Sequence, residues 1–221
     1  MPNIFYANKV EINSNTYYVC KKNEGVVMKY FISQIALISF IIFLSCTEER
    51  TEVNESQLDG MRMTSLEFMK NLKGILIKQM QTEGVLQAVS VCSDTAQVLT
   101  NNFGLQKGVY IRRVSFKNRN ENNFPDEFEK KILTKFELLK QNNELNDNTE
   151  HFEVMKEGEF TYLRYLKPIL IQAECLNCHG NKDAMLPEVK ELIASKYPED
   201  KAFGYNIGDF RGAVSIKKVI E

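Results

Sequence analysis

Five consecutive residues in the last quarter of the chain, Cys175-Leu176-Asn177-Cys178-His179, combine two thiols with an imidazole. A C-x-x-C-H run is typical of the covalent attachment of a c-type haem. The spacing lets one tight turn present both cysteines to the two vinyl groups of the macrocycle, and it places the histidine within reach of the iron. The motif therefore predicts one covalent haem c, with Cys175 and Cys178 as attachment residues and His179 as an axial metal ligand.

Three other kinds of site also use a C-x-x-C spacing. A disulfide or a thioredoxin-like redox dithiol is possible, but the redox motif normally opens a helix after a strand in a βαβ unit, and nothing around residue 175 indicates such a unit. A zinc site needs four ligands, and the chain has neither a second C-x-x-C nor an H-x-x-x-H run. These alternatives stay open, and haem is the favoured interpretation.

The N-terminal region predicts an export signal. Met28 and Lys29 precede an apolar run over 30–44, and the chain turns polar directly after Cys46. A short cationic start, an apolar stretch and small residues before a cleavage point are typical of such signals. The FLSC ending at 43–46 resembles the lipobox of bacterial lipoproteins, in which the cysteine is lipidated and becomes the first mature residue. An uncleaved membrane anchor is the alternative, although a spanning helix needs about 20 apolar residues.

These signals divide the chain into four parts. We expect residues 1–27 to be a non-native extension, residues 28–45 a lipoprotein signal peptide, residues 46–60 a polar tether and residues 61–221 the folded haem-binding domain. Acyl chains on Cys46 would hold the protein on a membrane. Bacterial c-type haem is attached on the outer side of the cytoplasmic membrane, so both signals indicate a periplasm-facing lipoprotein, on either the inner or the outer membrane.

Composition excludes some functions and leaves one cysteine without a role. The formal net charge is −1, which gives no basic footprint for nucleic acid. Of the five cysteines, two belong to the motif, Cys46 to the lipobox and Cys20 to the expected extension. Only Cys92 is left over. An unpaired thiol in an exported protein is notable, because cysteines in such proteins are usually paired.

Apolar periodicity predicts helices first and strands afterwards. Residues three or four apart predict one helix over 64–81 and, after a break at Gly84, a second over 85–103 in which Cys92 falls on the apolar face. A third helix is expected to start near Pro125, and a short one over 188–195. The segments that read as strands are 109–114, 151–155, 160–171 and 212–220. The order indicates an α+β domain.

Four groups of motifs are similar to one known family. They are AVSVC at 88–92; RVS at 113–115 with NRNENN at 118–123 and PD at 125–126; PI at 168–169 before CLNCHG at 175–180; and YPEDKA at 197–202 with GY, GD and RGA up to residue 213. From about residue 64 onward the chain resembles a family of bacterial c-type haem proteins with a PAS-like fold, long known only as a domain of unknown function. This resemblance implies a PAS-like antiparallel sheet with N-terminal helices packed on it.

The resemblance also implies the ligand on the far side of the iron. The family pairs the histidine of the motif with a cysteine on the helix that corresponds to Cys92. From the residues alone, His151, Met155, Met185 or an open sixth position are the alternatives. The chain departs from the family at Glu121, where proline is common, and in the loop over 141–150. Neither departure touches an expected ligand.

Basic residues near the predicted strand over 109–114 suit the carboxylates of haem. Arginine recognises carboxylates through paired hydrogen bonds, so we expect Arg113 and Arg119 to bind the haem propionates. Arg112 and Lys117 fit a solvated strand face better. The function we expect is sensing of redox state or of a small ligand, with a separate redox or signalling protein as partner. An electron-transfer cytochrome is the alternative. We expect no enzymatic activity, because a filled sixth position blocks a substrate such as peroxide and no distal acid/base pair stands out.

Overall fold

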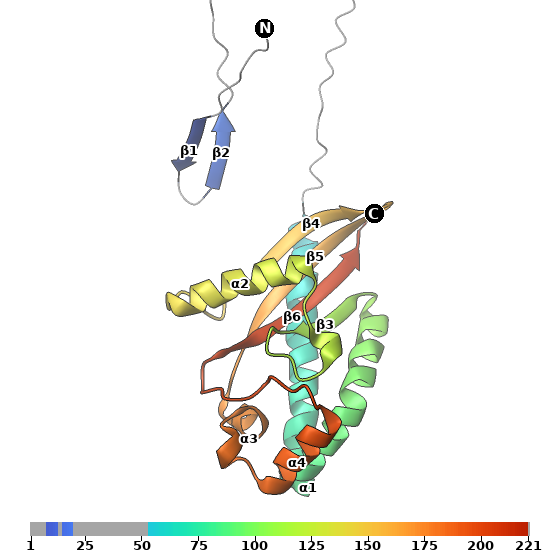
Figure 1. Cartoon of the computed structure of the whole chain (residues 1–221). Coiled ribbons are helices and arrows are strands. Elements are labelled where there is room, and N and C mark those ends of the chain that lie inside the picture. Colours follow the sequence, from blue (N-terminus) through green and yellow to red (C-terminus); the bar gives the residue numbers. More distant parts are fainter. Residues whose placement is uncertain (1–7, 13–14, 20–52, 221) are drawn as a thin grey trace, which may run out of the picture. The chain divides into compact units, whose positions relative to one another are not determined.

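The computed structural model describes residues 8–12, 15–19 and 53–220. Strands β1 (Asn8–Ile12) and β2 (Asn15–Val19) pair as an antiparallel hairpin in a unit of their own. All other elements belong to a second unit (Figure 1). The predicted signal peptide and lipidation site at Cys46 lie outside the described residues. No helix of the described part is both long enough and apolar enough to cross a membrane.

Helix α1 (Glu55–Lys107) consists of two arms that meet at Gly84. Gly84 has φ 85° and ψ 171°, a conformation that is essentially restricted to glycine. The predicted break is therefore confirmed. The arms lie against each other, since the rings of Phe68 and Phe103 are 5.4 Å apart and Lys107 pairs with Glu67 at 2.7 Å. Figure 1 shows them running in opposite directions.

The first arm begins earlier than predicted. Asn54 caps it, because its side chain accepts a hydrogen bond from Ser56 N at 3.0 Å and thereby satisfies a free donor of the first turn. Leu58 and Met61 are only 2% and 1% exposed and belong to the core. The expected tether over 46–60 is therefore wrong for residues 55–60, which are helical because Leu58 anchors them.

A four-stranded antiparallel sheet forms the centre of this unit. Its strands lie in the order β3 (Tyr110–Val114), β6 (Phe210–Val219), β5 (Phe160–Leu170) and β4 (His151–Glu157). Side chains alternate between the two faces of a strand, and here each face meets a different helix. The face with Ile111, Leu163 and Ile216 packs on α1. The α+β prediction, with N-terminal helices packed on an antiparallel sheet, is confirmed.

The opposite face of the sheet is covered only in part. Helix α2 (Glu127–Gln141) packs on Val114, Leu166 and Ala213 through its apolar residues Ile132, Leu133 and Phe136. It begins at Asp126, whose side chain accepts a hydrogen bond from Glu129 N at 2.8 Å. Within the described part of the chain, no helix packs on the part of this face beyond the start of α2.

Short elements complete the end of the unit that holds the C-x-x-C-H motif. They are the 3-10 turns Glu121–Asn123, Ala173–Cys175 and Lys182–Ala184, and the helices α3 (Leu176–His179) and α4 (Pro187–Lys196). Helix α4 packs its Val189 and Ile193 against Val89 in the second arm of α1. The loop after α4 leads back to β6 and therefore closes over the motif.

Candidate functional site

The C-x-x-C-H motif forms one compact turn directly after β5. A 3-10 turn ends at Cys175 and α3 continues from Leu176 to His179. Residues three apart in a helical turn share one side, so this backbone presents Cys175 and Cys178 in the same direction. Gln172 N donates a hydrogen bond to Cys175 Sγ at 3.4 Å, which holds the first thiol at the start of the turn.

The imidazole of His179 is fixed through one nitrogen. Its Nδ1 lies 2.6 Å from the carbonyl oxygen of Ala202. A carbonyl oxygen only accepts hydrogen bonds, so Nδ1 carries the proton and Nε2 keeps its lone pair. Tyr205 N donates to His179 O at 3.0 Å, and the two rings meet edge to face at 6.4 Å. Metal-binding histidines are held in this way.

Positive charge gathers around this imidazole. Burial, followed by the guanidinium groups of Arg119, Arg211 and Arg113, lowers the pKa of His179 well below its usual value. Burial and the other two arginines likewise lower the pKa of Arg211. We call Arg113, Arg119 and Arg211 the cationic cluster. It keeps the imidazole neutral, which is the form that can donate its lone pair to a metal.

Arg119 ties the motif to the loop that holds its histidine. Its Nη2 donates to the carbonyl oxygens of Cys178 and Ala202, and its Nε lies 3.2 Å from Asp200 Oδ2. Ala202 is the residue that also accepts the hydrogen bond from His179. Arg119 is thus a positioning residue for His179 as well as a cation beside it.

Arg211 reaches the site because of the glycine that follows it. Gly212 has φ 146°, and a Cβ at this position would lie 2.2 Å from Val114 O. Only glycine lets β6 pass so close to β3. Arg211 donates to Lys117 O at 3.0 Å, and its guanidinium lies 5.6 Å from the ring centroid of Tyr205. Sequence reasoning assigned no role to Arg211, although it lies within the RGA motif.

The basic residues expected near β3 divide between two sites. Arg113 lies in the cationic cluster, whereas its neighbour Arg112 pairs with Glu129 of α2 on the opposite face. Lys117 contacts the candidate site, since its Nζ donates to Phe203 O at 2.9 Å and lies 4.4 Å from the ring centroid of Tyr205. Arg112 pairs with Glu129, so the expectation of a plain solvated face is wrong for it, whereas Lys117 is exposed as expected although it also contacts Phe203 and Tyr205.

The second arm of α1 lies against the motif. Cys178 packs on a cluster to which Val85 and Val89 of this arm contribute, and Asp94 of the same arm pairs with Lys196 of α4 at 2.7 Å. Cys92 is three residues beyond Val89 on this helix, and its side chain lies outside the described part of the structure. Its role as an axial ligand stays a prediction.

The first arm of α1 contacts the other end of the motif. Lys73 Nζ lies 2.5 Å from Glu174 Oε1 and also donates to the side chain of Gln172. Gln172 directly precedes the 3-10 turn that ends at Cys175, and Glu174 lies within this turn. No sequence pattern predicts this contact, because Lys73 is one of many lysines on an amphipathic helix.

The alternative axial ligands lie on other elements. Met155 pairs with Tyr162, eight residues before the end of β5, which places it about 26 Å along the strand from the motif. His151 pairs with Leu166 and packs on Phe128 of α2, with ring centroids 6.0 Å apart. Met185 follows the 3-10 turn after the motif.

Comparisons with known proteins agree with this architecture. The chain is similar to the crystal structure of the cyanobacterial heme-protein Tll0287, with a TM-score of 0.54 and 24% sequence identity over 76% of this chain and 98% of that chain. A search of curated proteins finds no match. A comparison with protein families matches residues 28–218 to the Tll0287-like family. The match covers most of the sequence, and the chain therefore belongs to the Tll0287-like family.

Proposed function

We propose that the protein binds one c-type haem, held by thioether bonds from Cys175 and Cys178 and by His179 as an axial ligand. The observation that carries this proposal is the hydrogen bond from His179 Nδ1 to Ala202 O. It fixes the tautomer whose Nε2 can bind iron, directly beside two thiols on one turn. The likeness to a cyanobacterial heme-protein supports the same cofactor.

The cationic cluster fits the rest of this cofactor. Arg113, Arg119 and Arg211 lie close enough to lower the pKa of His179, and Arg119 also pairs with Asp200. The summed positive charge is strong enough to disfavour a further cation, since it lowers the pKa of both His179 and Arg211. Two propionate carboxylates would balance it, since arginine binds carboxylates with paired hydrogen bonds.

Cys92 is the second axial ligand in this proposal. The helical arm that carries it packs on Cys178 through Val85 and Val89. The family pattern noted in the sequence also places a cysteine ligand at this position. A haem supplies an iron centre that changes redox state and binds small ligands, and an anionic sulfur ligand favours its ferric state. We therefore expect a low midpoint potential.

The contacts of α1 favour a sensing role for redox state or a small ligand. The first arm is tied to the motif by Lys73, and the second by the cluster around Val89, on either side of the hinge at Gly84. A bond from Cys92 to a bound haem would hold the second arm in place, and loss of that bond would free it. A signal can then pass to a partner protein as a movement of this arm.

The proposed location is the periplasmic side of a bacterial membrane, with Cys46 as the lipid-bearing residue. Support for it comes from the sequence over 28–46 alone. The proposed partners are the membrane, through the lipid, and a redox or signalling protein. The proposal includes no enzymatic step.

Two measurements test the proposal. Mass spectrometry of the denatured chain should show one haem attached, and Cys175→Ser with Cys178→Ser should abolish the attachment. Ferric and ferrous spectra, with and without CO, should show that Cys92→Ala changes the ferric spectrum, whereas Ser93→Ala on the same helical turn does not. A chain without covalent haem would contradict the cofactor. Six-coordination that persists on reduction, with rapid electron exchange, would indicate an electron carrier instead of a sensor.

A further inference from the structure

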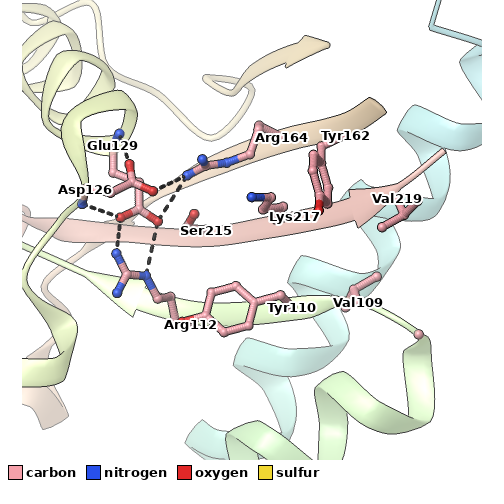
Figure 2. A pocket seen from close by; sticks show the side chains of 11 residues that line it. Val109, Tyr110, Arg112, Asp126, Glu129, Tyr162, Arg164, Ser215, Lys217 and Val219 are labelled. Carbon is pink, nitrogen blue, oxygen red and sulfur yellow. Dashed lines mark hydrogen bonds and ion pairs between the residues drawn. The ribbon is translucent and has the colours of Figure 1, made fainter. Parts of the chain in front are cut away.

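A cavity separate from the candidate haem site lies on the sheet face that α2 covers only in part (Figure 2). Its volume is about 570 Å³, within the roughly 300–1,000 Å³ range of small-molecule sites. Strand alternation places its lining on one side of β3, β6 and β5. The strand residues that line it are Tyr110, Arg112, Tyr162, Arg164, Ser215, Lys217 and Val219. The cavity shares none of these residues with the candidate haem site.

Two of its cations have permanent partners. Glu129, 1% exposed, pairs with Arg112 and lies 3.5 Å from Arg164, which also bonds Asp126 at 2.8 Å. Figure 2 shows these contacts at the start of α2. Asp126 and Glu129 additionally cap this helix through two reciprocal hydrogen bonds of 2.8 Å. These two carboxylates are therefore fixed in place and balance Arg112 and Arg164.

The third cation has only a replaceable partner. Lys217 pairs with Glu157, whose side chain is 40% exposed and whose Oε1 lies 3.7 Å from Arg164 Nη1. Glu157 is the last residue of β4, next to the turn at Gly158. Exposed ion pairs of this kind contribute little to stability. The space between Lys217 and Arg164 thus accommodates a carboxylate. The side chain of Glu157, which occupies this space, can turn away into solvent.

Two further polar side chains line the cavity. Arg164 is 5% exposed, and its Nη2 lies 2.8 Å from Asp126 Oδ2 and 3.5 Å from Glu129 Oε1. Ser215, 3% exposed, lies two residues before Lys217 on the same face. Its hydroxyl can donate a hydrogen bond to a carboxylate.

The other side of the cavity is apolar and aromatic. Val109 and Val219 line it, together with the rings of Tyr110 and Tyr162. The Nζ of Lys217 lies 3.9 Å from the ring centroid of Tyr162, and Tyr110 is 60% exposed. A ligand that fits both sides has one acceptor group and an apolar body.

We propose that this cavity binds a small monocarboxylic acid with an aromatic or apolar body. Its carboxylate replaces that of Glu157 between Lys217 and Arg164, and its body lies against Tyr162 and Tyr110. A single negative charge suits the site, because Arg112 and Arg164 are already balanced by Asp126 and Glu129. A dianion such as phosphate would exceed the one positive charge that is released.

Isothermal titration calorimetry of the full chain, with benzoate as the probe, tests this site. We expect saturable binding that Lys217→Gln weakens by about tenfold, the loss of one charge-assisted hydrogen bond. Glu157→Gln removes the competing carboxylate and should tighten binding several-fold. Lys218→Gln is the matched control, because Lys218 is the next residue of β6 and faces the other side of the sheet. The Lys218→Gln variant should bind benzoate with the same affinity as the unchanged protein.

Two further probes complete the experiment, one of them neutral and the other an anion without a ring. Benzamide has the same ring without the charge, and inorganic phosphate has the charge without the ring, so both should bind at least about tenfold more weakly than benzoate. The proposal is overturned by any of three results: no saturable heat with benzoate, equal affinity in Lys217→Gln and Lys218→Gln, or weaker binding in Glu157→Gln. A melting curve for each variant shows that it is folded.

Discussion

Arg112 and Arg113 are neighbours on β3, and the strand turns them to opposite faces of the sheet. Arg112 belongs to a group in which every described charge has a partner of opposite sign, formed with Arg164, Asp126 and Glu129. We call these four residues the paired cluster. Arg113 belongs to the cationic cluster around His179, whose guanidinium groups lower the pKa of that imidazole and of Arg211.

The difference between these clusters separates stability from ligand binding. Buried charges that are paired with each other stabilise a packing arrangement, and removing one partner is costly. Buried charges that repel each other destabilise the chain unless a ligand balances them, and such perturbed groups concentrate at functional sites. The paired cluster thus holds α2 on the sheet, whereas the cationic cluster is prepared for an anionic group.

The largest expected effect is on the paired cluster. Glu129→Ala should lower the free energy of unfolding by about 3–5 kcal/mol, because it leaves Arg112 and Arg164 buried without their shared carboxylate. It also removes the reciprocal cap of α2. Urea denaturation measures the change.

Glu127→Ala is the control for this substitution. Glu127 lies on the same helical turn, but its side chain is 90% exposed and pairs only with Lys130. Its loss should cost less than about 1 kcal/mol. Equal costs for the two variants would show that the paired cluster does not hold the fold.

The second expected effect distinguishes the clusters by redox potential. Arg211→Gln removes a positive charge near the proposed haem, which disfavours the reduced state and should lower the midpoint potential by on the order of tens of millivolts. It should cost little stability, because burial and the neighbouring arginines already disfavour this cation. Arg112→Gln should do the reverse, with a clear loss of stability and an unchanged potential. Potentiometry and urea denaturation of both variants measure this contrast.

Most of the local structure could be predicted from the sequence. Apolar spacing located both arms of α1 and the break at Gly84, and short β-branched segments located the strands. These signals are local, because they depend on residues within one or two turns. The start of α1 was missed because Val53 and Leu58 are isolated apolar residues in a polar stretch, and only tertiary packing shows that Leu58 is buried.

The composition of the two clusters could be predicted only in part. Arg113 and Arg119 were expected beside the haem, and both lie in the cationic cluster around His179. The pairing of Arg112 with Glu129 and the presence of Arg211 in the cationic cluster were not expected. Arg211 reaches the site from β6, which pairs with β3 about a hundred residues earlier in the chain, and Ala202 reaches it from the loop before β6. Such long-range pairings leave no local pattern. The C-x-x-C-H motif was found because its chemistry lies within five residues.

The third expected effect is on pH dependence. The carboxylate of Asp126 accepts hydrogen bonds from Glu129 N and from Arg164. These hold the pKa of Asp126 below its usual value of 3.8, although burial alone would raise it. The unfolded chain therefore binds more protons in this range, and stability is lost as the pH falls from above 3.8 through the lower folded pKa. Asp126→Asn should flatten this dependence in acid denaturation curves. Part of it should remain, because Arg62 and Tyr165 also lower the pKa of Glu150.

The smallest expected effect concerns the exposed cation beside the cationic cluster. Lys117 lies over the ring of Tyr205 at 4.4 Å and is exposed, whereas Arg211 is partly buried. Lys117→Ala should cost about 0.5–1 kcal/mol for the lost cation–π contact. It should shift the midpoint potential less than Arg211→Gln, and the shift should shrink as salt is added, because mobile ions screen exposed charges within about 10 Å at 0.1 M salt. The shift in Arg211→Gln should persist in salt. If salt shrinks both potential shifts equally, burial does not protect the charges of the cationic cluster from screening. The two clusters would then differ only in how their charges are paired.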